Sequence, residues 1–98
     1  MSTALTLATD RRKDGTVVLA AVGEIDMSNA ETFADALAEA RTASDGVFVV
    51  DLTQVEYIDS AGLAALFPHL EHLRLIATPL LGPVLTIAGM DDLTTIMN

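Results

Sequence analysis

The fold is decided by residues 47–67, VFVVDLTQVEYIDSAGLAALF. Val47 to Val50 is a continuous apolar run, too short for a helix, which indicates a strand buried on both faces that ends in Asp51-Leu52-Thr53. Farther on, Asp59-Ser60 precedes an apolar run rich in alanine, and Asp or Ser in this position is typical of a helix N-cap. The stretch therefore predicts a strand followed by a helix that begins at Ser60, give or take a residue.

Upstream of this stretch the sequence predicts another strand and a helix. Val17 to Val22 is a second continuous apolar run, and it too indicates a strand buried on both faces. Ser28-Asn29-Ala30-Glu31 fits a capping box, in which the Ser28 hydroxyl and the Glu31 carboxylate each bond a free backbone N–H, so the helix begins near Asn29. Ser44-Asp45-Gly46 ends it. Its apolar positions are Phe33, Ala36, Leu37 and Ala40. A strand, a helix and a strand with short joints predict a parallel pair.

The N-terminal segment predicts a hairpin. Leu5 to Gly15 and Thr16 to Gly23 are strand-like segments, and Asp14-Gly15 between them is a turn signal. The only basic run, Arg11 to Lys13, precedes this turn. We interpret it as a solvated turn rather than a binding patch.

Beyond Phe67 two interpretations remain open, because Pro68 should end or kink the helix while leucines keep a helical period across it. In the first, the helix stops near His72, residues 73–77 (LRLIA) form a strand, and a short helix runs over residues 83–90, with Pro83 in its first turn.

In the second interpretation the helix continues to about Ala77, Val84 to Ala88 form the strand, and Asp91 caps a terminal helix. Both give the same α/β class. We expect one domain over residues 1–98, with a mixed β-sheet of about four strands and helices packed against it.

Composition excludes several functions. The 98 residues carry fourteen Asp and Glu against five Lys and Arg, a net charge of -9, and no cysteine. Such a chain repels nucleic acid and anionic membrane surfaces and suits a basic protein or a cation, and it has no disulfide or thiolate zinc site. Residues 75–90, the longest uncharged stretch, fall short of the roughly 20 apolar residues that span a bilayer. With no secretory signal in the sequence, we expect a cytoplasmic protein without membrane insertion.

Acidic side chains and one hydroxyl stand at the ends of predicted elements. They are Glu24, Asp26, Asp51, Asp59 and Ser60. Because the carboxyl ends of parallel strands meet at one edge of a sheet, where ligands bind, these groups could face one another.

Enzymatic interpretations of these groups are weak. His69 and His72 lie two turns or more along the helix from Ser60, beyond hydrogen-bonding reach, and there is no GxSxG elbow. The two histidines lie three residues apart and could share a helix face near Glu71, but the sequence shows no third ligand, so we expect an exposed helix and no metal. Asp51 resembles a phosphoacceptor aspartate in its placement, but the chain is too short for five strand-helix units, and we favour a strand-end residue that bonds loop amides. Ser60 is either a regulated serine or a plain N-cap serine.

Three motifs resemble the STAS domain, which is found in sulfate transporters and anti-sigma factor antagonists. They are Gly23 to Asp26, Val47 to Leu52, and Tyr57 to Leu63, with a capped helix between the first two. The tail resembles the family less closely, through residues 73–77 and 87–91, and this favours the first interpretation of the C-terminal part. Compared with the family, the region after Gly62 and the C-terminus are short, and Pro68 interrupts the helix.

The resemblance implies an anti-sigma factor antagonist, a transcription regulator rather than an enzyme. Such a protein binds an anti-sigma factor that is also a serine kinase and so releases a sigma factor, until phosphorylation of the serine in the Asp-Ser motif blocks binding. Carried over, the phosphoacceptor is Ser60, no cofactor is needed, ATP belongs to the partner, and the protein is a monomer or weak dimer. The partner-binding residues implied are Glu24, Asp26, Asp59, Ser60, Gly62 and Leu63.

Two alternatives remain open within the same resemblance. One is a STAS-type regulatory subunit of a lipid or ion transport complex, which need not be phosphorylated. The other is a degenerate STAS domain that has lost switching and binds its partner constitutively.

Overall fold

The computed structural model describes residues 4–97, apart from the side chain of Asp91. The elements follow one another as β1 (Thr6–Arg11), β2 (Val17–Ile25), α1 (Ala30–Ala43), β3 (Phe48–Ile58), α2 (Ser60–Leu66), the 3-10 helix η1 (Phe67–His72), β4 (Leu73–Ala77), α3 (Gly82–Ile87), the 3-10 turn η2 (Asp91–Leu93) and β5 (Thr94–Ile96).

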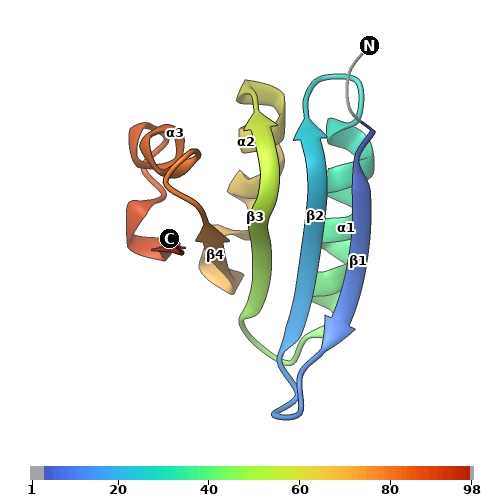
Figure 1. Cartoon of the computed structure of the whole chain (residues 1–98). Coiled ribbons are helices and arrows are strands. Elements are labelled where there is room, and N and C mark those ends of the chain that lie inside the picture. The colour runs from blue at the N-terminus through green and yellow to red at the C-terminus, as the bar shows by residue number, and fades with distance from the viewer. Residues whose placement is uncertain (1–3, 98) are drawn as a thin grey trace.

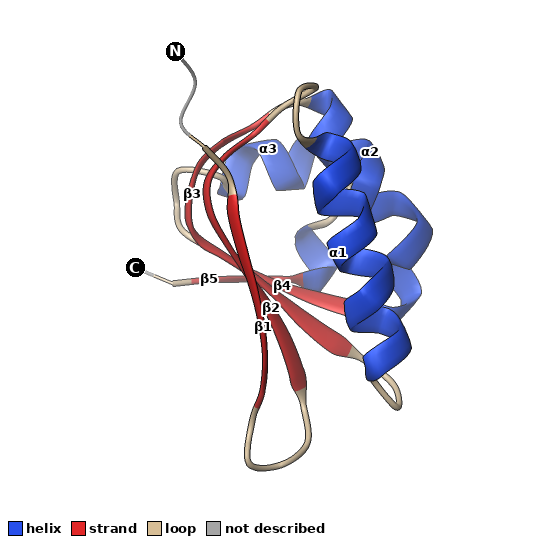
Figure 2. Cartoon of the chain, turned by 90° about the vertical axis from the view of Figure 1, so that its right-hand side faces the viewer, coloured by secondary structure: helices blue, strands red, loops and turns tan. Residues whose placement is uncertain are grey.

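The strands form one mixed sheet in the order β1-β2-β3-β4-β5. β1 pairs antiparallel with β2, and every other neighbouring pair is parallel. Figures 1 and 2 show α1 and α2 together on one face of this sheet, with α3 beyond β4. The predicted α/β class, the hairpin and the parallel pair across α1 are all confirmed.

The C-terminal part follows the first of the two interpretations. The helix that begins at Ser60 passes into a 3-10 helix at Phe67, with Pro68 in its first turn, and residues 73–77 form β4. The second interpretation, with a strand over residues 84–88, is wrong because that segment belongs to α3 and its continuation. The sequence analysis missed β5, a strand of 3 residues that pairs with β4.

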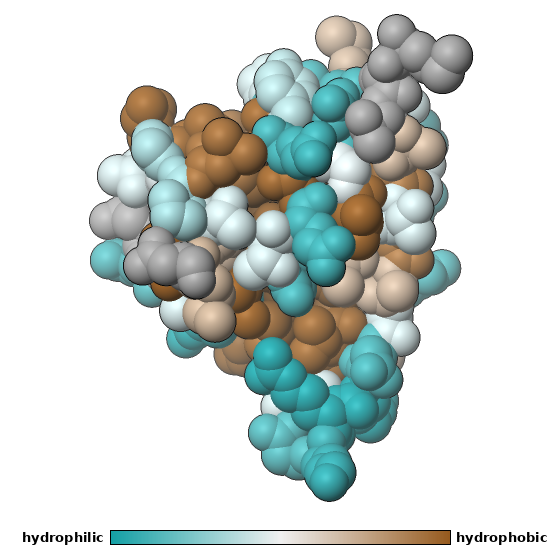
Figure 3. All heavy atoms as spheres, viewed as in Figure 1, coloured by the Kyte–Doolittle hydropathy of each residue, from teal (hydrophilic) through white to brown (hydrophobic). Residues whose placement is uncertain are grey.

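Only one face of the sheet is covered by helices, so the predicted burial of two strands on both faces is wrong. In β2 the side chains alternate between buried and partly exposed, and Val22 is 42% exposed. Val47, before β3, is 44% exposed. The uncovered face carries small and β-branched side chains, which gave these strands their uniformly apolar sequence. Figure 3 shows this face as apolar surface interrupted by polar side chains, with the polar hairpin turn at its lower end.

β3 bends because it carries two irregularities in its pairing with β2. The register shifts between Ala20 and Val22 of β2 and again between Gly23 and Glu24, and each shift leaves one extra residue on β3. Burial on β3 accordingly falls on Phe48, Val50 and Leu52, and then on Val55 and Ile58. These bulges break the two-residue alternation and turn the strand toward the start of α2.

The second half of β3 has a strand partner on one side only. Its pairing with β4 ends at Asp51, whereas its pairing with β2 continues to Ile58. After Ala77 the chain leaves the sheet in a turn at Thr78 and enters α3. Among the described residues, therefore, no strand lies along the outer edge of β3 from Thr53 to Ile58.

The start of α1 is where the sequence predicted it, but its predicted capping box is wrong. The N-cap residue is Asn29, and neither its side chain nor that of Ser28 bonds a free N–H of the helix. Instead, the Ser28 hydroxyl donates to Asp26 and the Asn29 amide bridges back to β2. The polar residues before α1 thus build the β2-α1 loop, residues 26–29.

Candidate functional site

The ends of β2 and β3 bring two acidic segments together. Ile25 lies opposite Ile58, the last residues of the two strands, and the backbone N–H of Asp59 donates to the carbonyl of Ile25 at 3.1 Å. The β2-α1 loop that begins at Asp26 therefore lies next to the junction of β3 and α2. This confirms that the carboxyl ends of the two strands share an edge.

Asp59 joins the two segments. One carboxylate oxygen accepts the backbone N–H groups of Ala61 and Gly62, at 2.9 and 3.1 Å, which caps α2. The other oxygen accepts the backbone N–H of Met27 at 3.2 Å. Because one carboxylate holds both the helix and the loop, the geometry around Ser60 is fixed from two sides.

Ser60 is exposed at the first position of α2, directly after the capping residue. Within residues 4–97 its hydroxyl has no hydrogen-bond partner, whereas the hydroxyl of Ser28 donates to Asp26. Ser60 does not itself cap α2, since Asp59 does so. Its side chain is therefore available to another molecule.

Asp26 is held by its own loop. One carboxylate oxygen accepts the hydroxyl and the backbone N–H of Ser28. These two hydrogen bonds, the hydroxyl bond first, lower the pKa of Asp26 below its ordinary value of 3.8. The group stays ionised at neutral pH, so Asp26 and Asp59 place two carboxylates on the surface beside Ser60.

The other residues predicted for partner binding have different surroundings. Glu24 is partly buried, and its backbone carbonyl accepts the side-chain amide of Asn29 at 2.8 Å. Leu63 is partly buried and packs against the core. Gly62 is buried, and it lets the start of α2 approach Ile25 and Ile58 closely. Gly62 thus helps to position Ser60, because its lack of a side chain allows the start of α2 to pack on the strand ends. The partner contacts of Glu24, Gly62 and Leu63 stay predictions.

Asp51 does not belong to this site, contrary to the expectation that it ends a strand. It lies in the first half of β3, which continues seven residues further to Ile58, about 20 Å along the strand at the usual rise. Its carboxylate accepts the backbone N–H of Thr53 at 2.9 Å and the Thr53 hydroxyl at 2.6 Å. Asp51 thus bonds its own strand at the first bulge.

His69 lies in the core, so the expectation of two exposed histidines is wrong for it. Only 9% of the residue is exposed, and its ring lies T-shaped to that of Phe48, with the two ring centroids 6.3 Å apart. His72, three residues on, is partly buried. Residues 4–97, leaving out the side chain of Asp91, contain no group of three or more His, Asp or Glu side chains placed to hold a metal ion.

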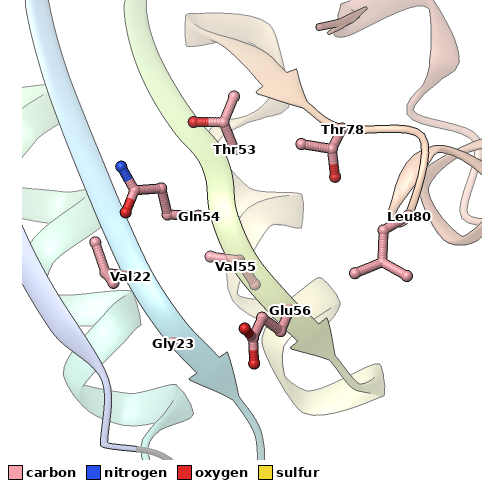
Figure 4. Close-up of a pocket in the computed structure, with 8 residues that line it drawn as sticks. All are labelled: Val22, Gly23, Thr53, Gln54, Val55, Glu56, Thr78 and Leu80. Carbon is pink, nitrogen blue, oxygen red and sulfur yellow. The ribbon is translucent and has the colours of Figure 1, made fainter. Parts of the chain in front are cut away.

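A separate hollow of about 350 Å³ lies at the second half of β3 and is lined by residues 53–56 of that strand. Figure 4 shows its other lining residues on the two sides of β3, with Val22 and Gly23 on β2 and with Thr78 and Leu80 in the segment after β4. It contains neither Asp26, Asp59 nor Ser60, so it is distinct from the site at the end of β3. None of the helices in the described part of the chain has the length and apolar character needed to cross a membrane.

The sequence analysis missed Met27. This side chain is 82% exposed in the middle of the β2-α1 loop, directly between Asp26 and Ser28. No periodicity marks a single apolar residue in a polar loop, and its exposure follows from the hydrogen bonds that fold the loop. The arrangement as a whole offers an exposed hydroxyl, two carboxylates and one apolar side chain to a partner, and among the described residues no side chain bonds the Ser60 hydroxyl.

Comparison with known proteins finds a matching protein family and several similar solved structures. A family model described as "Mlab, STAS domain" matches residues 8–95. No curated protein matches the sequence significantly.

Solved structures match from 74% to 95% of this chain. An anti-sigma factor antagonist from Mycobacterium paratuberculosis is 26% identical, with a TM-score of 0.83 over 95% of this chain and 85% of that one. The anti-sigma factor antagonist SpoIIAA in its unphosphorylated form is 16% identical, with a TM-score of 0.76 over 95% and 89%. An antisigma-factor antagonist STAS domain from Rhodobacter sphaeroides is 19% identical, with a TM-score of 0.57 over 74% and 84%.

Proposed function

This chain belongs to the STAS domain family, and from that premise we propose that it is an anti-sigma factor antagonist. It binds an anti-sigma factor through the surface formed by Asp26, Asp59 and Ser60, and so releases a sigma factor in the cytoplasm. The anti-sigma factor is a serine kinase that uses ATP, and phosphorylation of Ser60 ends the interaction. The chain itself carries no cofactor and catalyses no reaction.

The observation that carries the proposal is the state of the Ser60 hydroxyl. It is exposed and unbonded within the described residues, although it stands beside a carboxylate that makes three hydrogen bonds. A serine needed only as a helix cap would use its hydroxyl on a free backbone N–H. Similarity to an anti-sigma factor antagonist at 26% identity supports the same role.

Electrostatics explains how phosphorylation would switch the surface. A phosphoserine carries a charge of about -1.5 to -2 at neutral pH. At Ser60 this charge would stand beside Asp26 and Asp59, on a protein of net charge -9. A partner that docks there through hydrogen bonds and apolar contact would meet a dense, strongly hydrated anion, and the complex would dissociate.

The test uses the chain with its candidate anti-sigma kinase and ATP. We expect phosphate on Ser60 alone, mapped by mass spectrometry, with Ser28 as the internal control because its hydroxyl lies in the adjoining loop and already donates to Asp26. In a binding assay, Ser60→Ala should bind the kinase about as tightly as wild type, and Ser60→Asp at least tenfold more weakly.

Other outcomes favour the alternatives. Phosphate absent from Ser60, or Ser60→Asp binding as tightly as Ser60→Ala, would refute the switch. Constitutive binding that survives Ser60→Glu would indicate a STAS domain that no longer switches. An unmodified serine in cells, together with co-purification of an ATPase and a membrane permease, would indicate a subunit of a transport complex.

A further inference from the structure

Met27 is a large apolar residue that the fold leaves in water on the loop next to Asp59. The residue is 82% exposed, while the core of the same domain buries residues as large as Phe33 and Met90 completely. Leaving a large apolar side chain in water forgoes the free energy that its burial would release. A partner that covers Met27 would gain that free energy on binding.

The loop that carries Met27 is already folded into one shape. Asp26 accepts two hydrogen bonds from Ser28, and the side-chain amide of Asn29 both accepts from the Asp26 N–H and donates to the Glu24 carbonyl. The backbone N–H of Asn29 donates to the carbonyl of Asp26 at 3.1 Å. A partner therefore need not order this backbone when it binds, which removes one of the usual losses of association.

Met27 is tied to the residue next to Ser60. Its backbone N–H donates to one oxygen of Asp59, and the other oxygen of the same carboxylate caps α2. The Met27 backbone and the start of α2 thus share one carboxylate. A molecule large enough to cover Ser60 also meets Met27.

The surroundings of Met27 define the chemistry of the partner. Asp26 and Ser28 flank it in sequence and Asp59 touches its backbone, so an apolar side chain stands on an acidic surface. The complementary partner has an apolar pocket with a rim of neutral hydrogen-bond donors, such as backbone N–H groups, for the carboxylates. Met suits such a pocket because its unbranched side chain adapts to the shape it enters.

We propose that Met27 is the apolar anchor of the partner surface, inserted into a pocket of the anti-sigma factor that is rimmed by neutral hydrogen-bond donors. The proposal rests on the proposed function and assigns an energetic role to a residue outside the Asp-Ser motif.

The experiment measures the affinity of four purified proteins for the anti-sigma kinase that phosphorylates Ser60 in the test of the proposed function. They are wild type, Met27→Ala, Met27→Leu and Ile87→Ala. Ile87, on α3, is the matched control because it is 88% exposed. We expect Met27→Ala to bind at least tenfold more weakly, Met27→Leu to stay within about threefold because it conserves volume, and Ile87→Ala to equal wild type.

The outcomes separate this inference from the proposed function. If wild type binds and Met27→Ala binds as tightly, the anchor is refuted while the proposed function stands. An equal loss in Met27→Ala and Ile87→Ala also refutes it, since exposed apolar area would then act regardless of position. If wild type itself fails to bind, the proposed function fails and the anchor fails with it. Equal thermal midpoints for all four proteins exclude unfolding as the cause.

Discussion

Gly62 is a position where a single methyl group should disturb the site. A Cβ built there would lie 2.7 Å from side-chain carbons of both Ile25 and Ile58, the last residues of β2 and β3. Those side chains are buried and have little room to move. The start of α2, and with it Ser60, can sit this close to the strand ends only because residue 62 has no side chain.

We predict that Gly62→Ala destabilises the protein by about 1–2 kcal/mol. Overpacking costs roughly 1–3 kcal/mol, and the better helix propensity of alanine offsets part of it. Urea unfolding measures the change. Gly46→Ala is the control, because a Cβ at Gly46 meets nothing within 4 Å. A Gly62→Ala variant as stable as Gly46→Ala would contradict the close packing described here.

At the residue scale, the sequence predicted Asp26, Asp59 and Ser60 as neighbours because each follows or ends a recognisable element. It could not predict Met27, since a lone apolar residue in a polar loop has no periodicity. The burial of His69 could not be predicted from the sequence either, because it depends on the helix geometry after Pro68. At Pro68 the chain is in a 3-10 helix, which has 3.0 residues per turn instead of 3.6. A pattern based on α-helical spacing therefore assigns His69 to the wrong face.

At the scale of elements, Asp59 couples α2 to the β2-α1 loop. Mutation can distinguish the roles of its two carboxylate oxygens, one of which caps α2 while the other accepts the Met27 N–H. Asparagine is as good an N-cap as aspartate, so Asp59→Asn should keep the bonds to Ala61 and Gly62. Its NH₂ group cannot accept the N–H of Met27, which the second oxygen of Asp59 accepts.

We therefore predict that Asp59→Asn keeps the stability of wild type to within a few tenths of a kcal/mol, whereas Asp59→Ala loses about 1 kcal/mol. Hydrogen exchange at the Met27 amide should speed up in both variants, and urea unfolding should separate them. A protected Met27 amide in Asp59→Asn would show that the loop is held without this carboxylate.

The elements themselves were predicted unevenly. Local signals, namely apolar runs, turn residues and helix caps, predicted the hairpin, α1, the start of α2 and β4. The length of β3 does not, because Thr53, Gln54 and Glu56 interrupt its pattern at the two bulges, and the sequence analysis ended the strand at Asp51-Leu52-Thr53. β5 is too short to carry a pattern and exists because β4 offers an edge.

At the scale of the molecule, stability against pH should depend on His69, which lies where η1 packs on the sheet. Burial, and next the nearby charges of Arg41 and His72, lower the pKa of His69 below 6.5. Its Nδ1 is buried and finds no partner among the described residues. The unfolded chain therefore binds a proton that the folded chain refuses, and stability falls as pH drops below 6.5 toward the lower folded pKa.

We predict that wild type loses stability as the pH falls through a window that begins near 6.5, the ordinary pKa of histidine, by at most about 1.4 kcal/mol per pH unit. His69→Leu should remove this slope, and His72→Gln, which removes only the last of the causes that lower the pKa of His69, should keep most of it. The carboxylates of Asp14 and Asp26, with pKa values lowered from 3.8, lose their contributions only below that window. Urea unfolding at several pH values provides the measurement, and a slope unchanged in His69→Leu would contradict the assignment.

The half-paired β3 has a consequence for how copies of this protein behave in a crowded solution. A long, regular strand edge invites any extended chain to pair with it, which is how sheets grow into aggregates. The outer edge of β3 from Thr53 to Ile58 is long, but its bulges break the even spacing of donors and acceptors, and Glu56 places a charge beside it. The two extra residues that bend β3 toward the start of α2 therefore also hinder the pairing of this edge with a strand of another molecule.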